Sequence, residues 1–201
     1  MTLLLLACAP EPEIVDRPVQ TYGDDTGTAA WSGPCPEYTV QIGDLCVDAY
    51  EAFVLDGIAV SLPGADPTTF VTWDDARSAC AAAGKRLCTT AEWQTACAWG
   101  GGTYPWGEEP APHEVCAIPD PEGNQRYDEV QPAGSLPDCR NPNGVFDQVG
   151  NVWEWVDEAG EPYKVGGAYY TGTANAVCAS PPVYHDGDGT IGLRCCVDAR
   201  E

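Results

Sequence analysis

Cysteine is the most chemically versatile residue type that this chain uses in quantity. The sequence holds 11 cysteines in 201 residues, and no two of them form a Cys-x-x-Cys pair. Short Cys-x-x-Cys pairs are typical of zinc sites, whereas widely spaced cysteines in an oxidising compartment form disulfides. The spacing therefore favours disulfides over a zinc site and indicates a location outside the cytoplasm.

Oxygen ligands for a metal ion gather between residues 147 and 154. Asp147 and Glu154 are separated by a turn-forming Gly150-Asn151 pair. Calcium binds about six to eight oxygens, including backbone carbonyls, and such a turn can fold both carboxylates around one ion. The alternative is a hydrogen-bonded turn without a metal.

The histidines offer little further chemistry. His113 and His185 both lie in loop-like sequence, and no Gly-x-Ser-x-Gly motif is present. We therefore predict two solvated surface histidines and no hydrolase site.

Charge narrows the choice of partners. The chain has 9 Lys and Arg against 31 Asp and Glu, which gives a net charge of −22. Such a surface repels phosphate backbones, so a nucleic-acid partner is not expected. Seven Trp and nine Tyr within 44% hydrophobic residues can fill a core. No apolar run approaches the ~20 residues of a membrane span.

The N-terminus predicts a lipid anchor. Residues 1–8 end in Leu-Leu-Ala-Cys, which resembles a bacterial lipobox and would make Cys8 the lipidated residue. Ala9 rather than Asp follows Cys8, which favours the outer membrane of the cell envelope. Only seven residues precede Cys8, fewer than a signal peptide needs, so an untethered apolar N-terminus is the alternative.

A tether separates this anchor from the folded domain. Residues 9–33 hold three prolines, three glycines and five acids against one base. Acidic Pro-rich stretches stay extended because they have little to bury. We therefore divide the chain into a truncated lipoprotein signal (1–8), an acidic tether (9–33) and a folded domain (34–201).

Two short helices are marked by their caps. Thr72 is an N-cap candidate for a helix that ends at Gly84. Thr89 and Glu92 form a capping-box pattern, which begins a second helix that runs to about Trp99.

The strands are also short, and the segment 100–148 is rich in Gly, Pro, Asn and Asp, which predicts loops. Strands are predicted at Glu37–Ile42, Leu45–Tyr50, Val152–Val156, Tyr163–Tyr170 and Gly192–Val197. The fold class is therefore α+β, loop-rich and stapled by disulfides.

Several motifs, in a fixed order, carry a family resemblance. They are Gly84-Lys85-Arg86-Leu87-Cys88, Tyr104-Pro105-Trp106-Gly107, Gly150-Asn151-Val152-Trp153-Glu154-Trp155, Gly166-Gly167-Ala168 and Gly192-Leu193-Arg194-Cys195. Over about residues 45–201 the chain resembles the sulfatase-modifying-factor family, which includes the formylglycine-generating enzyme. This resemblance implies a variant of the C-type-lectin-like fold. It also makes most of the motif residues the signature of a fold.

The resemblance also implies a structural calcium and a set of disulfides. One calcium would be held by Asp147, Glu154 and the carbonyls of Gly150 and Val152. The family pairs carry over as Cys80–Cys195 and Cys97–Cys178, and Cys116 with Cys139 is a third pair because both flank one loop. Cys35, Cys46, Cys88 and Cys196 are left with three possible pairings.

The catalytic residues of the family are missing. The formylglycine-generating enzyme oxidises a substrate cysteine with two cysteines that bind copper(I), a soft ion that prefers thiolates. Counted from Gly166-Gly167-Ala168, the matching positions hold Thr171 and Ala176. We therefore expect no catalytic residues and no copper.

The resulting hypothesis is a non-catalytic binding or structural module that is anchored by lipid and faces an unknown protein or glycan ligand. The alternative is a divergent formylglycine-generating oxidoreductase, if the alignment over 168–178 is displaced.

Overall fold

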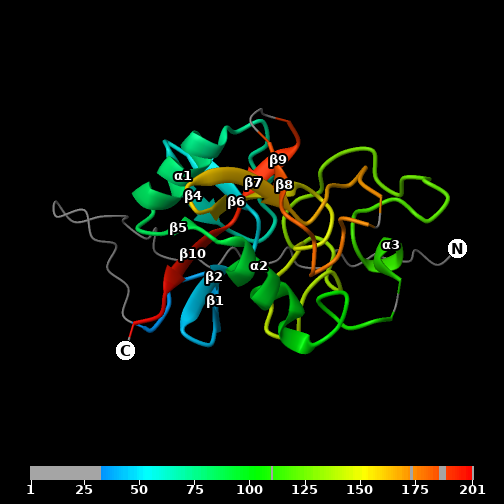
Figure 1. The fold of residues 1–201 in the computed structure, drawn as a ribbon, viewed down its shortest axis with the longest axis horizontal. Helices are drawn as coiled ribbons and strands as arrows, with labels where there is room; N and C mark the ends of the chain where they lie inside the picture. The colour runs from blue at the N-terminus through cyan, green and yellow to red at the C-terminus, as the bar shows by residue number, and fades with distance from the viewer. Residues whose placement is uncertain (1–32, 110, 173, 186–188, 201) are drawn as a thin grey trace, which may run out of the picture.

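The computed structural model describes residues 33–109, 111–172, 174–185 and 189–200, which fold around two β-sheets (Figure 1). The smaller sheet has four strands in the order β1-β2-β10-β5, all antiparallel. Its strands are β1 (Thr39–Ile42), β2 (Leu45–Asp48), β10 (Cys195–Asp198) and β5 (Arg86–Leu87).

The larger sheet has six strands in the order β4-β3-β9-β6-β7-β8. Its strands are β4 (Ile58–Ser61), β3 (Ala52–Leu55), β9 (Ile191–Leu193), β6 (Trp153–Glu158), β7 (Glu161–Val165) and β8 (Val183–Tyr184). Only β6 and β9 run parallel; the other neighbours are antiparallel. The parallel pair places the two motifs that contain Glu154 and Gly192 side by side.

The helices begin where their caps predict. The Thr72 hydroxyl accepts a hydrogen bond from the Asp75 N–H at 3.1 Å, at the start of α1 (Trp73–Ala82). Thr89 and Glu92 form a complete capping box before α2 (Thr90–Cys97). The second helix is shorter than predicted, because the chain continues as a 3-10 turn, η1 (Ala98–Gly100).

The strand predictions missed one hairpin and needed correction elsewhere. The β3–β4 hairpin was missed, although its Asp56-Gly57 turn, with positive φ at both residues, is the Asp-Gly signal of a type I′ turn. The strand predicted over Tyr163–Tyr170 ends at Val165, because Gly166 and Gly167 take φ values of 88° and 76°.

The segment Gly192–Val197 is not one strand. It is divided between β9 and β10, which belong to different sheets, with Arg194 between them. Arg194 is completely buried, so the break lets a charged side chain enter the interior between the two sheets.

The loop prediction for 100–148 is confirmed. In the described part of this segment the only helix that begins there is α3 (Pro112–Val115). These loops lie together on one side of the two sheets, as the green-to-yellow part of the chain (Figure 1). They are nevertheless packed, since Ile118 and Val145 are buried in the same hydrophobic cluster as Trp93.

Five disulfides fasten the loops and helices. They are Cys35–Cys46, Cys80–Cys195, Cys88–Cys196, Cys97–Cys178 and Cys116–Cys139. These include the three pairs expected from the resemblance and the loop, and they assign the four cysteines left open. Five disulfides are typical of a protein from an oxidising compartment. Among the described residues, no helix is long and apolar enough to cross a membrane.

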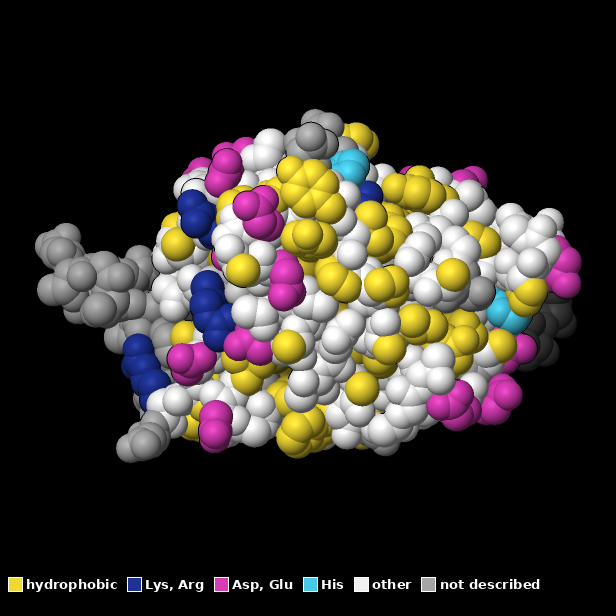
Figure 2. Space-filling view, in the orientation of Figure 1, with side chains coloured by type: hydrophobic (Ala, Val, Ile, Leu, Met, Phe, Trp, Pro, Cys, Tyr) yellow, Lys and Arg dark blue, Asp and Glu magenta, His cyan; other side chains and the backbone are white. Residues whose placement is uncertain are grey.

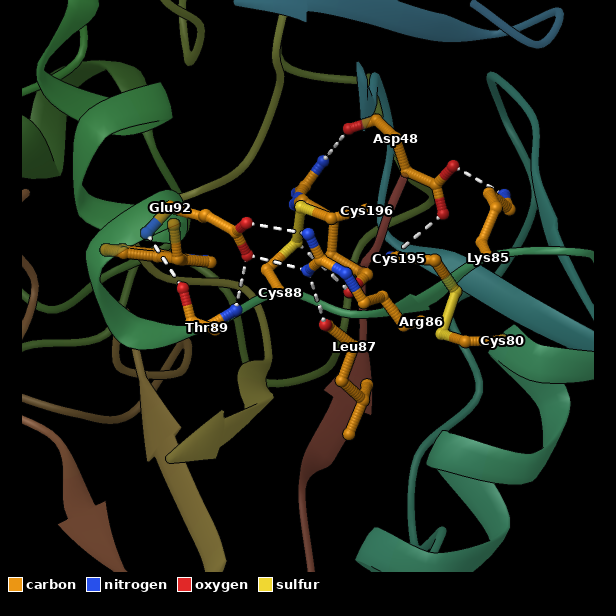
Figure 3. Close-up of a disulfide and its surroundings, with 12 residues drawn as sticks. Asp48, Cys80, Lys85, Arg86, Leu87, Cys88, Thr89, Glu92, Cys195 and Cys196 are labelled. Atoms are coloured by element: carbon orange, nitrogen blue, oxygen red, sulfur yellow. Dashed lines mark hydrogen bonds and ion pairs between the residues drawn. A yellow bond between two sulfur atoms is a disulfide. The ribbon is translucent and has the colours of Figure 1, made fainter. Parts of the chain in front are cut away.

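Two of these disulfides involve adjacent residues of β10 (Figure 3). Cys195 is joined to α1 and Cys196 to the residue that follows β5. Between them, Asp48 accepts hydrogen bonds from Lys85 Nζ at 2.6 Å and from the Cys195 N–H at 3.0 Å. Strand β10 is therefore held by covalent and polar contacts at once.

Candidate functional site

The motif residues meet in a buried polar cluster around Arg194. Its guanidinium donates to Glu154 at 2.7 Å from Nη2 and at 3.0 Å from Nε. Further bonds of 2.7 Å reach the carbonyl oxygens of Asp48 and Phe146. Glu154 also accepts a 2.6 Å hydrogen bond from Trp93 Nε1. Arg194 therefore bridges a buried carboxylate and two backbone carbonyls.

Arg86, the arginine of the Gly84-Lys85-Arg86-Leu87-Cys88 motif, lies outside this cluster. It forms bonds of 2.7 Å to Glu92 and 3.1 Å to Asp198, but its side chain is 43% exposed. Arg86 therefore fastens the surface between α2 and β10 rather than the interior.

Glu51 and Asn151 belong to the buried cluster, although the sequence analysis did not select them. The Asn151 side-chain amide donates to Glu51, and the Val152 N–H donates to the same carboxylate at 3.2 Å. The sequence offered one indication of this role, because Glu51 is a charged residue directly before the apolar strand β3. Its burial could not be foreseen without the partner that lies 100 residues away.

Burial shifts the pKa values of these groups. Burial raises the pKa of Glu51 well above its usual range, and the charges of Asp147 and Glu154 add to the shift. Burial also raises the pKa of Asp147 to about 7, although the Gly134 N–H and the Arg194 charge both lower it. For Arg194, burial lowers the pKa, but the Glu154, Glu51 and Asp147 carboxylates together outweigh burial and raise it. The cluster thus holds more acid than base.

The proposed calcium ligands lie in this cluster, and calcium stays a proposal. The donor chemistry suits that ion, because all the ligands are oxygens. The cluster also contains three buried carboxyl groups and one guanidinium, so acidic groups outnumber the basic one. In the described geometry the same carboxylate oxygens accept hydrogen bonds from the protein. Glu154 accepts hydrogen bonds from Arg194 and Trp93. Asp147 accepts a 2.6 Å bond from the Gly134 N–H. Within the described ranges, no group of three or more His, Cys, Asp or Glu side chains is arranged to hold a metal ion.

The turn that brings Asp147 and Glu154 together depends on Gly150. It takes φ of 84°, and a Cβ there would lie 2.4 Å from the carbonyl oxygen of Ala117. Gly150 and Val152, the expected carbonyl ligands, are both buried in this turn. Glycine is therefore required at position 150 by both conformation and space.

The two positions that match the copper cysteines lie together around Gly167. A Cβ built on Gly167 would lie 3.5 Å from the Cβ atoms of both Thr171 and Ala176. The Thr171 hydroxyl accepts a 3.0 Å hydrogen bond from the Ala168 N–H. The turn therefore brings the matching positions close to each other, but the side chains there are a hydroxyl and a methyl group. All ten cysteines in the part of the chain that the structure describes are in disulfides.

The prediction of two solvated surface histidines was wrong, because both residues are half-buried. The His185 ring lies 5.8 Å from the ring of Trp155. His113 lies in α3 rather than in a loop. Cys8 and residues 9–32 of the predicted tether lie outside the described residues.

Comparison with known proteins identifies the class to which this fold and site belong. The family model for the sulfatase-modifying factor enzyme 1-like domain matches residues 41–195 of this chain. The chain belongs to that family, and it has the loop-rich α+β variant of the C-type-lectin-like fold that the family implies.

Two relatives show how the similarity is distributed. The chain is 41% identical over 97 residues to the inactive C-alpha-formylglycine-generating enzyme 2 of Bos taurus, covering 45% of this chain and 32% of that protein. It is 37% identical over 102 residues to the formylglycine-generating enzyme of Mus musculus, covering 46% and 27%. The chain thus spans about a third of the length of these relatives.

Among solved structures, that of CarF has a TM-score of 0.56 at 18% identity, covering 78% of this chain and 87% of that one. This similarity concerns the fold alone.

Proposed function

We propose that this chain is an extracytoplasmic, non-catalytic binding module of the sulfatase-modifying-factor family, attached to the cell envelope through a lipid on Cys8. One observation carries the proposal. The positions that would hold a copper(I) thiolate pair, Thr171 and Ala176, flank Gly167 but offer no thiol. A relative whose name includes the word inactive, at 41% identity, supports the same reading.

The ligand preference of copper(I) explains why the absence of the two thiols matters. Copper(I) is a soft ion, and a hydroxyl with a methyl group cannot replace two thiolates. The nearest cysteine in sequence, Cys178, is joined to Cys97 and has no free thiol. Oxidation of a substrate cysteine by oxygen would therefore lack its metal.

The experiment measures copper(I) binding and oxidase activity on the same preparation. Wild-type protein is titrated with copper(I) against a chromophoric chelator, and then assayed with a cysteine-containing peptide in air. We expect neither stoichiometric binding nor oxidation of the peptide. Tight binding of one copper(I), or turnover of the peptide, would favour the divergent formylglycine-generating oxidoreductase instead.

A double variant provides the positive control. Thr171→Cys combined with Ala176→Cys places two thiols at positions whose Cβ atoms both lie 3.5 Å from the same point. After mild reduction this variant is expected to bind one copper(I) per chain, whereas the single variants Thr171→Cys and Ala176→Cys, each with one thiol at this turn, are not.

A further inference from the structure

A pocket of about 370 Å³ lies among the loops of 100–148, and it includes no residue of the Arg194 cluster or of the turn around Gly167. Its lining consists of three apolar and three polar side chains: Trp106, Val115, Pro142, Asp138, Arg140 and Asn141. Ligand pockets commonly measure about 300–1,000 Å³ and combine apolar surface with a few placed polar groups.

Two walls of this pocket are joined covalently. Val115 directly precedes Cys116, and Asp138 directly precedes Cys139. The Cys116–Cys139 disulfide therefore fixes the distance between the apolar wall and the acidic wall.

The wall that carries Trp106 is held by its own short loop. Tyr104 and Gly107 exchange two backbone hydrogen bonds, of 3.1 and 3.0 Å. The Trp106 indole stacks on the Tyr104 ring at 5.5 Å between centroids, nearly parallel. The ring is thereby oriented before any ligand binds.

The wall that carries Arg140 and Asn141 is also held in place by contacts within the protein. Asn141 is buried, and its amide donates to the Ala96 carbonyl at 2.8 Å. Its side-chain oxygen accepts from the Asn143 and Val145 N–H groups at 2.9 and 3.0 Å. The Arg140 guanidinium, which lines the pocket, lies 5.4 Å from the Phe146 ring.

The rim offers polar groups to a ligand. Asp138 and Arg140 are exposed, and neither side chain forms an ion pair with any described residue. A carboxylate accepts hydrogen bonds and a guanidinium donates them, so the two together match hydroxyl groups, which do both.

Charge decides against an anionic ligand. The chain carries −22, and acidic side chains are spread across the face in Figure 2 while most visible Lys and Arg side chains lie toward one end. A neutral ligand avoids that repulsion. Exposed Asp138 and Pro142 also leave the pocket open to solvent, so a ligand could continue beyond it.

We propose that this pocket binds a neutral saccharide, with the apolar face of a sugar ring against Trp106 and its hydroxyls on Asp138 and Arg140. An aromatic ring offers a large, rigid apolar surface to such a face. Preorganised walls reduce the ordering cost of binding. This inference rests on the proposed binding function and names the ligand class for it.

The test uses the full chain with neutral mono- and disaccharides of glucose, galactose, mannose and N-acetylglucosamine, and follows binding by saturation-transfer NMR. At least one saccharide is expected to bind. Asp138→Asn and Arg140→Gln, which leave the core intact, should each weaken binding about tenfold, because each removes a charge-assisted hydrogen bond. Trp106→Ala should abolish binding.

Matched controls come from exposed residues elsewhere. Asp74→Asn and Arg77→Gln alter an exposed acid and base on α1, and Trp99→Ala removes an exposed indole outside the pocket lining. All three should bind the saccharide like the wild type.

The inference fails if no saccharide in the panel binds, or if the Asp138 and Arg140 variants retain wild-type affinity. It also fails if the pocket binds leucine, tested as a zwitterionic probe, in place of the sugars. The copper and peptide assays on the same preparation keep the two ideas apart. Peptide oxidation with intact sugar binding would overturn the proposed function alone, and absence of both would overturn the saccharide alone.

Discussion

Arg194 and Glu154 form an ion pair in which both side chains are at most 1% exposed, and it connects the chain between β9 and β10 to the start of β6. The pair lies between the two sheets. Its guanidinium also holds the Asp48 and Phe146 carbonyls. One side chain therefore connects both sheets and the loop before the Gly150 turn.

Glu154→Gln should destabilise the fold strongly, because it removes the only carboxylate among the described residues that is hydrogen-bonded to the buried guanidinium. Breaking a buried ion pair costs about 3–5 kcal/mol. The free energy of unfolding, measured in urea with the disulfides intact, checks this. Asp74→Asn, in the exposed pair with Arg77, is the control and should change it by less than about 0.5 kcal/mol. Equal effects of the two variants would contradict the role given to Glu154.

Removal of calcium should lower the melting temperature, if the proposed ion is bound by Asp147 and Glu154. A ligand at a hundredfold excess over its dissociation constant stabilises by about 2.7 kcal/mol. Asp147→Asn should lose the response to a chelator, whereas Asp120→Asn, at an exposed site, should keep it. An identical wild-type melting curve with and without chelator would count against the site.

Acid should weaken the contact between Arg86 and Glu92. Burial alone would raise the pKa of Glu92, but hydrogen bonds from Arg86 and the Thr89 N–H, together with the Arg86 charge, hold it below its usual value. A carboxyl group with a lowered folded-state pKa stabilises the fold above its unfolded pKa of about 4.3, and this is lost as the pH falls through the folded value.

Urea unfolding at neutral and acidic pH measures this loss. Glu92→Gln should differ from the wild type by less than about 1 kcal/mol at neutral pH, since the pair is partly exposed and solvent weakens it. The difference should shrink below about pH 4. Glu161→Gln, at an exposed position of β7, should show no such convergence. A constant difference for Glu92→Gln at all pH values would refute the prediction.

Non-reducing peptide mapping should recover the five disulfides of the structure. Replacement of Cys116 and Cys139 together by Ala should cost about 2–4 kcal/mol, because the unfolded chain regains the freedom of a loop. The same double variant should also weaken saccharide binding, because the covalent link between the pocket walls that carry Val115 and Asp138 is lost. A peptide that joins Cys88 to Cys97, or free thiols at Cys80 and Cys97, would overturn the family alignment.

Lipidation at Cys8 is tested by labelling. Cells that express the wild type should incorporate labelled fatty acid into the protein and place it in the membrane fraction, and the Cys8→Ala variant should lose both. Equal labelling of the two proteins would rule out the anchor. The extracytoplasmic location would then rest on the disulfides alone.

Local signals in the sequence determined the features that depend on neighbouring residues. The caps at Thr72 and Thr89 were readable because each acts on backbone groups three residues away. The Asp56-Gly57 turn was equally local and could have been recognised. The order of motifs identified the family, and the spacing of cysteines excluded a zinc site of the Cys-x-x-Cys kind.

Only the tertiary structure decided features that depend on distant residues. The pairing of Cys35 with Cys46 and of Cys88 with Cys196 was open, because a disulfide requires Cα atoms about 4.4–6.8 Å apart and sequence spacing does not give that distance. The burial of Glu51 against Asn151 is decided in the same way. The division of Gly192–Val197 at Arg194 follows from a partner 40 residues away, since a buried charge must reach its counter-ion even at the expense of a continuous strand.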